Sequence, residues 1–293
     1  MARTYSPLRY PGGKACLKPV VSALIKRNGM QRWHYVEPYA GGCGLALSLL
    51  YGGYVSDIHV NDWDPSIWSF WKAALDHTDD LVRHIQTTDL TIANWKAMRE
   101  TQLREDASDP VELGFAAFFL NRTNRSGIIK GAGVIGGLDQ RGSYKMDCRF
   151  NRDDLIRRIR RVSKYRSRIH LTRLDAVAFM QRSSELPERS FFCIDPPYFN
   201  KGASLYTSFY KPADHVEVAR AVLALRHPWI VTYDNVQEIK DLYRERRQFV
   251  FDINYSVQTK RVGTELMVAS KGLLVTPEVK ERQTHRVQYR AAA

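Results

Sequence analysis

The chain of 293 residues is 44% hydrophobic and 26% charged, which is typical of a soluble globular protein large enough for one domain with an insertion. No apolar run approaches the roughly 18 residues of a membrane span, and the N-terminus lacks the apolar segment of a secretory signal. The four cysteines lie far apart, with no histidine at ligand spacing. We therefore expect no disulfide, no metal site and a location in the cytoplasm.

Residues 33–75 predict an alternation of strands and helices. The segment "WHYVEP" favours a strand, "AGGCG" a glycine turn, "LALSLLYGG" a helix and "VSDIHVND" a second strand. This order is typical of an α/β protein with a doubly wound, mostly parallel sheet.

Acidic residues stand where both of these predicted strands end. Glu37 ends the first strand and Asp62 the second, and ligands of open α/β sheets bind beyond the carboxyl ends of the strands. The glycine turn allows a ligand close to the backbone, although such a turn is as often purely structural. Asp62 is the candidate acceptor for ribose hydroxyls, whereas Asp64 before Pro65 fits a helix cap.

The next segment, residues 76–165, differs in composition and predicts an inserted, mainly helical domain. Helical periodicity continues to residue 120, a loop with six glycines follows, and residues 153–166 predict an amphipathic basic helix. Residues 121–168 hold fourteen Lys or Arg and four Asp, a net charge of +10, of the +13 of the whole chain. Such a concentration favours binding to nucleic acid phosphates over a merely solvated helix face.

The α/β pattern resumes afterwards, so we predict one discontinuous catalytic domain, residues 1–75 and 166–293. Asp175 closes another strand, at a position that fits either an adenine amine acceptor or a helix cap. "RQFVFDINYSVQ" and "ELMVASKG" predict a C-terminal antiparallel hairpin.

The strongest signal is "FFCIDPPYFN", an apolar strand that stops at Asp195, Pro196, Pro197 and Tyr198. Consecutive prolines remove N–H donors and prevent a following helix from using the nearby carbonyl groups. The result is a rigid pair of acceptors, a carboxylate and a carbonyl, beside an aromatic ring. This arrangement suits a planar base that carries an amino group, and a proline-stopped strand with a capping Asp is the alternative.

Five motifs in order, "PLRYPGGK", "VEPYAGGCG", "VND", "FFLNRTNRSG" and "DPPY", resemble those of the Dam-like adenine-N6 DNA methyltransferases. These belong to the alpha group of S-adenosylmethionine-dependent amino-methyltransferases. The resemblance covers most of the chain and implies a Rossmann-like methyltransferase fold, with the inserted domain as the target-recognition domain. In the glycine turn, Cys43 stands where relatives have the second glycine.

The resemblance also implies roles for individual residues. Asp195, Pro196, Pro197 and Tyr198 surround a flipped target adenine, the methyl acceptor. The donor S-adenosylmethionine, whose product is S-adenosylhomocysteine, is bound by Tyr10, Gly12, Gly13, Lys14, Glu37, Tyr39, Gly41, Asp62, Asp175 and Asp195. We expect double-stranded DNA to be contacted, mostly at phosphates, by Arg122, Asn124, Arg125, Lys130, Arg141, Arg157, Arg158 and Arg161.

Three alternatives remain open. An RNA adenine-N6 methyltransferase would use the same motif, and a DNA-binding regulator without catalysis would be compatible with Cys43. A nicotinamide-dependent oxidoreductase is disfavoured because GxGxxG is absent. We expect a monomer or weak dimer of bacterial or phage origin, without a membrane partner, and the sequence leaves open whether it belongs to a restriction or defence system.

Overall fold

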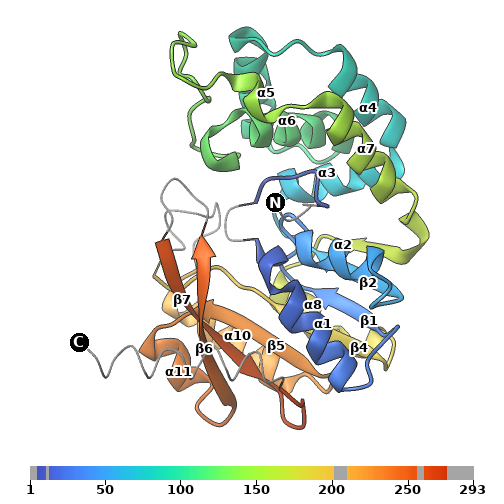
Figure 1. Cartoon of the computed structure of the whole chain (residues 1–293), viewed down its shortest axis with the longest axis vertical. Coiled ribbons are helices and arrows are strands. Elements are labelled where there is room, and N and C mark those ends of the chain that lie inside the picture. The colour runs from blue at the N-terminus through green and yellow to red at the C-terminus, as the bar shows by residue number, and fades with distance from the viewer. Residues whose placement is uncertain (1–4, 11–12, 201–209, 256–260, 276–293) are drawn as a thin grey trace. The chain divides into compact units, whose positions relative to one another are not determined.

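The computed structural model describes residues 5–10, 13–200, 210–255 and 261–275, which form two compact units shown in Figure 1. Unit 1 comprises Met1–Gly13, Gly41–Gly44 and Asp62–Arg173. Unit 2 comprises Lys14–Ala40, Leu45–Asn61 and Leu174–Ala293. The described residues contain no helix that is both long enough and apolar enough to cross a membrane.

A seven-stranded sheet has the order β3-β2-β1-β4-β5-β7-β6. Its strands are β1 (His34–Glu37), β2 (Asp57–Asn61), β3 (Ile169–Thr172), β4 (Ser190–Ile194), β5 (Trp229–Asp234), β6 (Arg247–Tyr255) and β7 (Arg261–Ala269). β1 is parallel to β2 and β4, and β4 to β5, whereas β7 is antiparallel to β5 and to β6. The predicted α/β class with a mostly parallel sheet is confirmed.

The strand order reverses at β1, which pairs with β2 on one side and β4 on the other. Ligands of doubly wound sheets bind beyond the carboxyl ends of the strands at such a switch point. β1 ends at Glu37 and β4 at Ile194, directly before Asp195. The topology therefore brings both acidic strand ends of unit 2 to the place where a ligand is expected.

The helices of unit 2 cover the sheet and build its core. They are η1 (Lys14–Leu17), α1 (Lys18–Arg27), α2 (Gly44–Tyr51), α8 (Ala176–Gln181), η5 (Ser183–Glu185), α10 (Pro212–Ala224) and α11 (Gln237–Leu242). Phe192 and Val231 on the strands pack with Met180 of α8, Val222 of α10 and Ile239 of α11 in one buried cluster. Burial of this apolar surface stabilises the strand ends that carry the site.

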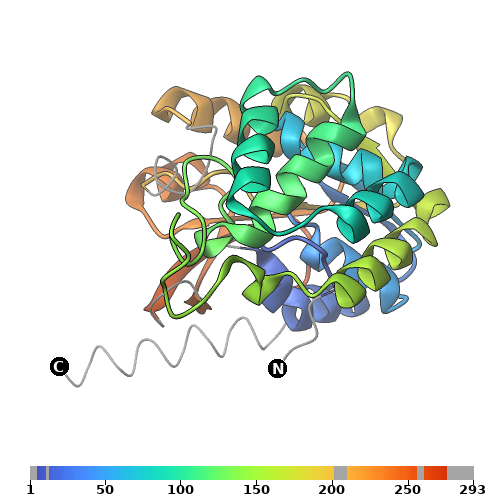
Figure 2. The same cartoon turned by 90° about the horizontal axis from the view of Figure 1, so that it is seen from above.

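Unit 1 is mainly helical, with α3 (Pro65–Asp76), α4 (Thr78–Thr87), α5 (Ile92–Arg104), α6 (Pro110–Thr123), α7 (Arg152–Ser163) and the short turns η2 (Arg125–Gly127), η3 (Met146–Arg149) and η4 (Arg166–Arg168). The green helix α6 lies among α3, α4 and α5 (Figure 2). A Cβ atom on Gly114 would lie 2.6 Å from the Ser69 carbonyl oxygen, so glycine permits the close contact of α6 with α3. Phe118 stacks on Phe70 at 5.6 Å beside it.

The predicted insertion 76–165 lies inside unit 1 and contains α4 to α7. The start of α3 follows the sequence signal, since Asp64 accepts hydrogen bonds from its first N–H groups. Asp109, which the sequence reasoning did not single out, does the same for α6. The domain boundaries and the function of the insertion stay predictions.

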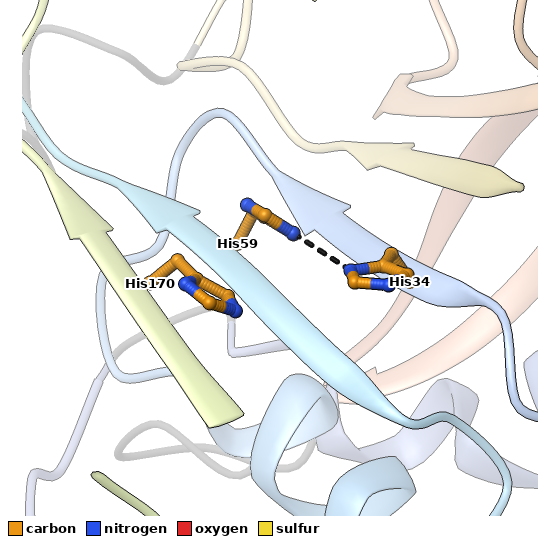
Figure 3. A group of neighbouring side chains, drawn as sticks. All are labelled: His34, His59 and His170. Carbon is orange, nitrogen blue, oxygen red and sulfur yellow. Dashed lines mark hydrogen bonds between the residues drawn. The ribbon is translucent and has the colours of Figure 1, made fainter. Parts of the chain in front are cut away.

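Two histidines form a cross-strand pair in unit 2. His34 Nδ1 of β1 and His59 Nε2 of β2 are 2.9 Å apart and share a hydrogen bond (Figure 3, which also labels His170 of β3). Asp57, the register partner of His34, has a carboxylate oxygen 3.9 Å from His34 Nε2.

Candidate active site

The glycine turn of unit 1 is fixed by Asp62. Its Oδ2 accepts the N–H of Gly41 at 2.7 Å, and its Oδ1 accepts the N–H of Asp64 at 3.0 Å. Trp71 Nε1 donates to the Gly41 carbonyl at 2.8 Å. The carboxylate that was predicted to hold a ribose thus also connects the end of β2 to the turn.

The Tyr10 ring packs on the same turn and explains its glycines. A Cβ on Gly41 would lie 2.7 Å from the ring, and one on Gly42 would lie 2.8 Å from Tyr10 Cβ. Gly41 has a φ of +46°, and Cys43, which is buried, has a φ of 48°. For a residue with a side chain this left-handed conformation costs about 1–2 kcal/mol, so Cys43 occupies a position that favours glycine.

Burial raises the pKa of Asp62 from 3.8 to about 7, against the lowering effect of the hydrogen bond from Gly41. The group is therefore a hydrogen-bond acceptor whose charge responds to pH near neutrality.

Of the other predicted donor-binding residues near the N-terminus, Gly13 is exposed and donates to the Tyr10 carbonyl at 3.1 Å. Gly12 lies outside the described residues.

Glu37 lies buried at the end of β1 in unit 2. Its Oε1 accepts the hydroxyl of Tyr35 at 2.9 Å, and its carboxyl group also accepts the backbone N–H of Ala46 in the first turn of α2. Burial raises its pKa to about 8. The side chain thus caps a helix, which is an alternative to direct donor binding.

Asp175 and Tyr39, two other predicted donor-binding residues, are also engaged within unit 2. Asp175 accepts the N–H groups of Val177 and Ala178 and caps α8, which is the structural alternative that its sequence position left open. The Tyr39 hydroxyl lies 3.3 Å from the Tyr210 hydroxyl. Contacts of either residue with the donor stay predictions.

Four polar side chains converge after β4 in unit 2. Lys14 Nζ lies 3.0 Å from Asp195 Oδ1, 2.6 Å from the Tyr198 hydroxyl and 3.2 Å from Glu265 Oε1. Tyr198 donates its hydroxyl to the same Glu265 oxygen. The structure therefore brings Lys14 to the DPPY residues and adds an acid from β7.

Asp195 is held by Thr232 of β5 as well as by Lys14. The Thr232 hydroxyl donates to Asp195 Oδ1 at 2.9 Å, so both hydrogen bonds reach the same oxygen. No partner of Oδ2 is found among the described residues. Burial raises the pKa of Asp195 from 3.8 to about 6, although Lys14 and Thr232 lower it. The carboxyl group is an oriented acceptor for an amino group.

The remaining residues of the motif are closely packed. Pro196 is buried, Pro197 is half-buried and Tyr198 has only 2% of its surface exposed. Lys14 Nζ lies over the Tyr198 ring, 4.8 Å from its centre. Stacking of this ring on a base stays a prediction.

Sequence reasoning missed three supporting residues, Thr232, Asp234 and Glu265. Both oxygens of Asp234 accept backbone N–H groups just beyond the motif, from Phe199 and Asn200, each at 2.9 Å. The sequence carried a signal for Thr232 and Asp234, because they are polar residues at the end of the predicted strand "WIVTYDN". Glu265 carried no such signal, because it stands in the middle of β7.

The predicted DNA-binding residues of unit 1 fall into two groups. Arg122 and Asn124 are buried: Arg122 Nε donates to the Pro7 carbonyl at 2.9 Å, and Asn124 accepts from Trp95. Lys130 is half-buried and paired with Asp64 at 3.2 Å and with Glu105. These contacts favour structural roles, and the DNA contacts of this group stay predictions.

The second group is more accessible. Arg125 lines a cavity of about 580 Å³ together with Lys96 and Arg99, two cations that the sequence reasoning did not single out. Arg141 and Arg157 are exposed. Arg158 donates to the Ser6 carbonyl at 3.0 Å, and the Arg161 guanidinium lies over the Tyr5 ring.

The family model described as D12 class N6 adenine-specific DNA methyltransferase matches residues 10–261. No curated protein sequence matches the chain.

Proposed function

Because the chain belongs to the D12 class N6 adenine-specific DNA methyltransferase family, we propose that it methylates an adenine flipped out of double-stranded DNA at a specific sequence. S-adenosylmethionine-dependent methyl transfer to adenine N6 in DNA is the activity of this family. The observation that carries the proposal for the site is the Asp195 carboxyl group, held at the end of β4 by Thr232 and Lys14.

The residues of unit 1 fit a nucleoside-type donor. Asp62 offers a carboxylate beside a turn that Tyr10 restricts to glycine at residues 41 and 42, which suits ribose hydroxyls and a close backbone approach. We propose that Asp62 binds the ribose and that Tyr10 encloses the donor. When bound, S-adenosylmethionine supplies an electrophilic methyl group on a sulfonium centre.

The target adenine is proposed to bind at the DPPY residues. An adenine N6 amine inside a duplex cannot enter such a pocket, so the base is flipped out. Asp195 Oδ2 and the Pro196 carbonyl accept the two amine protons, which increases electron density on the nitrogen and orients its lone pair. After transfer the nitrogen loses one proton, and a carboxylate with a pKa of about 6 is suited to receive it. Orientation and electrostatics supply most of the rate enhancement.

Tyr198 is proposed to stack on the flipped base. Its ring is buried and lies under Lys14, so stacking requires a rearrangement of this side chain when DNA binds. The cations around Arg125 and the exposed Arg141 and Arg157 are proposed to bind phosphates.

The test is to incubate the protein with S-adenosylmethionine and a mixed-sequence duplex, and to map every methylated base. We expect N6-methyladenine in one short sequence context. Single-stranded DNA and RNA of the same sequence serve as comparison substrates. Faster methylation of the RNA than of the duplex would favour an RNA methyltransferase, and donor binding that is absent in calorimetry would favour a non-catalytic regulator.

A further inference from the structure

Glu265 of β7 is a fully buried acid in the middle of a strand. Its side chain has no exposed surface, and its register partners are Asp234 on β5 and Phe251 on β6. A buried carboxylate is costly unless it is paired and hydrogen-bonded. A hydrophobic residue would fill this sheet position at lower cost, so the carboxyl group requires an explanation.

Two partners of Glu265 belong to the DPPY site. Lys14 Nζ lies 3.2 Å from its Oε1, and the Tyr198 hydroxyl donates to the same oxygen. Lys14 is at the same time 3.0 Å from Asp195. One ammonium group is therefore shared between a carboxylate expected to contact the target base and a carboxylate that is remote from it.

We propose that Glu265 is a positioning residue for methyl transfer. Glu265 pairs with Lys14 and so weakens the effect of the Lys14 charge on Asp195. Asp195 therefore stays a strong acceptor for the target amine. The inference rests on the proposed function of Asp195. Glu265 also accepts the hydroxyl of Tyr198 in the same motif.

The charges around Asp195 give the direction of the expected effect. Lys14 lowers the pKa of Asp195, and the charge of Glu265 raises it. Asp234 is the register neighbour of Glu265 on β5, Glu37 lies at the end of β1, and the hydroxyls of Thr232 and Tyr198 complete the surroundings. Without the charge of Glu265, Lys14 pairs with Asp195 alone. The pKa of Asp195 then falls, and its carboxylate becomes a weaker acceptor.

The experiment compares the full-length wild type with Glu265→Gln, measuring kcat and KM for duplex DNA between pH 5 and 8.5. We expect kcat of Glu265→Gln to fall about tenfold, KM to change less than twofold, and the acid limb of the kcat profile to move to lower pH. Glu185→Gln, which removes an exposed acid paired with Arg182, is the matched control and should leave the profile unchanged.

Glu265→Asp keeps the charge and should keep the wild-type acid limb, even if its shorter side chain lowers the yield of folded protein. An unchanged acid limb in Glu265→Gln, or a loss of activity that only follows the folded fraction in both variants, overturns the inference. A wild-type protein that methylates no DNA in the same assay refutes the proposed function instead, so the two failures are distinguishable.

Discussion

Replacement of Asp195 by Asn tests the site most directly, because it removes a charge and keeps the shape. The carboxylate accepts from Thr232 at 2.9 Å and contacts Lys14 at 3.0 Å. An amide oxygen is a weaker acceptor than a carboxylate, and the amide cannot receive the proton released from N6. We expect kcat to fall by about a hundred- to a thousandfold, whereas DNA binding, which we propose depends on the cations of unit 1, stays near wild type.

The same substitution should stabilise the fold. The pKa of Asp195 is raised from 3.8 to about 6, so the folded state binds the proton more tightly than the unfolded state does. The ionised carboxylate therefore destabilises the fold above pH 6, by about 3 kcal/mol for roughly two pKa units. Asn mimics the neutral acid and removes this cost. The gain should be full above pH 6 and disappear as the pH falls toward 4.

Denaturant unfolding at pH 8 and pH 5 measures the stability, and labelled methyl incorporation measures the activity. The exposed Asp241→Asn is the control and should change neither. An Asp195→Asn protein that is less stable than wild type at pH 8 would refute the electrostatic reasoning, and one with wild-type methylation rates would refute the assignment of Asp195.

Three further expectations follow from the contacts. Thr232→Val removes a hydrogen bond that lowers the pKa of Asp195, so the acid limb of kcat should move to higher pH, and an unmoved limb contradicts this role. Asp62→Ala removes the acceptor that holds the glycine turn; calorimetry should show S-adenosylmethionine binding weakened about tenfold or more, with Asp62→Asn affected less. Substituting Arg157 and Arg158 by Ala should weaken binding to all DNA sequences and make the DNA affinity less dependent on salt concentration. An unchanged salt dependence indicates that these arginines only form a solvated helix face.

Local signals predicted the elements well, because each depends on neighbouring residues. The glycine turn at residues 40–44 and the capping Asp64 mark helix starts that the structure shows. Cys43 illustrates the limit: the sequence shows a substitution within the turn, but only the backbone shows that the residue has positive φ.

The candidate site was predictable only in part. Asp195 and Asp62 were found because parallel strands end at one edge of the sheet. Glu265 was not, because nothing in the sequence indicates that β7, rather than β6, lies beside β5. Arg122 was predicted to contact DNA from its charge, whereas its burial against the Pro7 carbonyl depends on a contact over more than a hundred residues.

The hydrogen bonds from β5 also determine how far the DPPY motif is transferable between proteins. Thr232 holds the motif at its first residue, and Asp234 holds the two N–H groups just beyond its last. Because two prolines lie between these attachments, the short segment has few ways to adjust on its own. Transferring only the four residues of the motif into another α/β sheet should therefore fail to reproduce its conformation. A graft that also includes the Thr-x-Asp triplet of the adjacent strand brings along the hydrogen bonds that hold the motif.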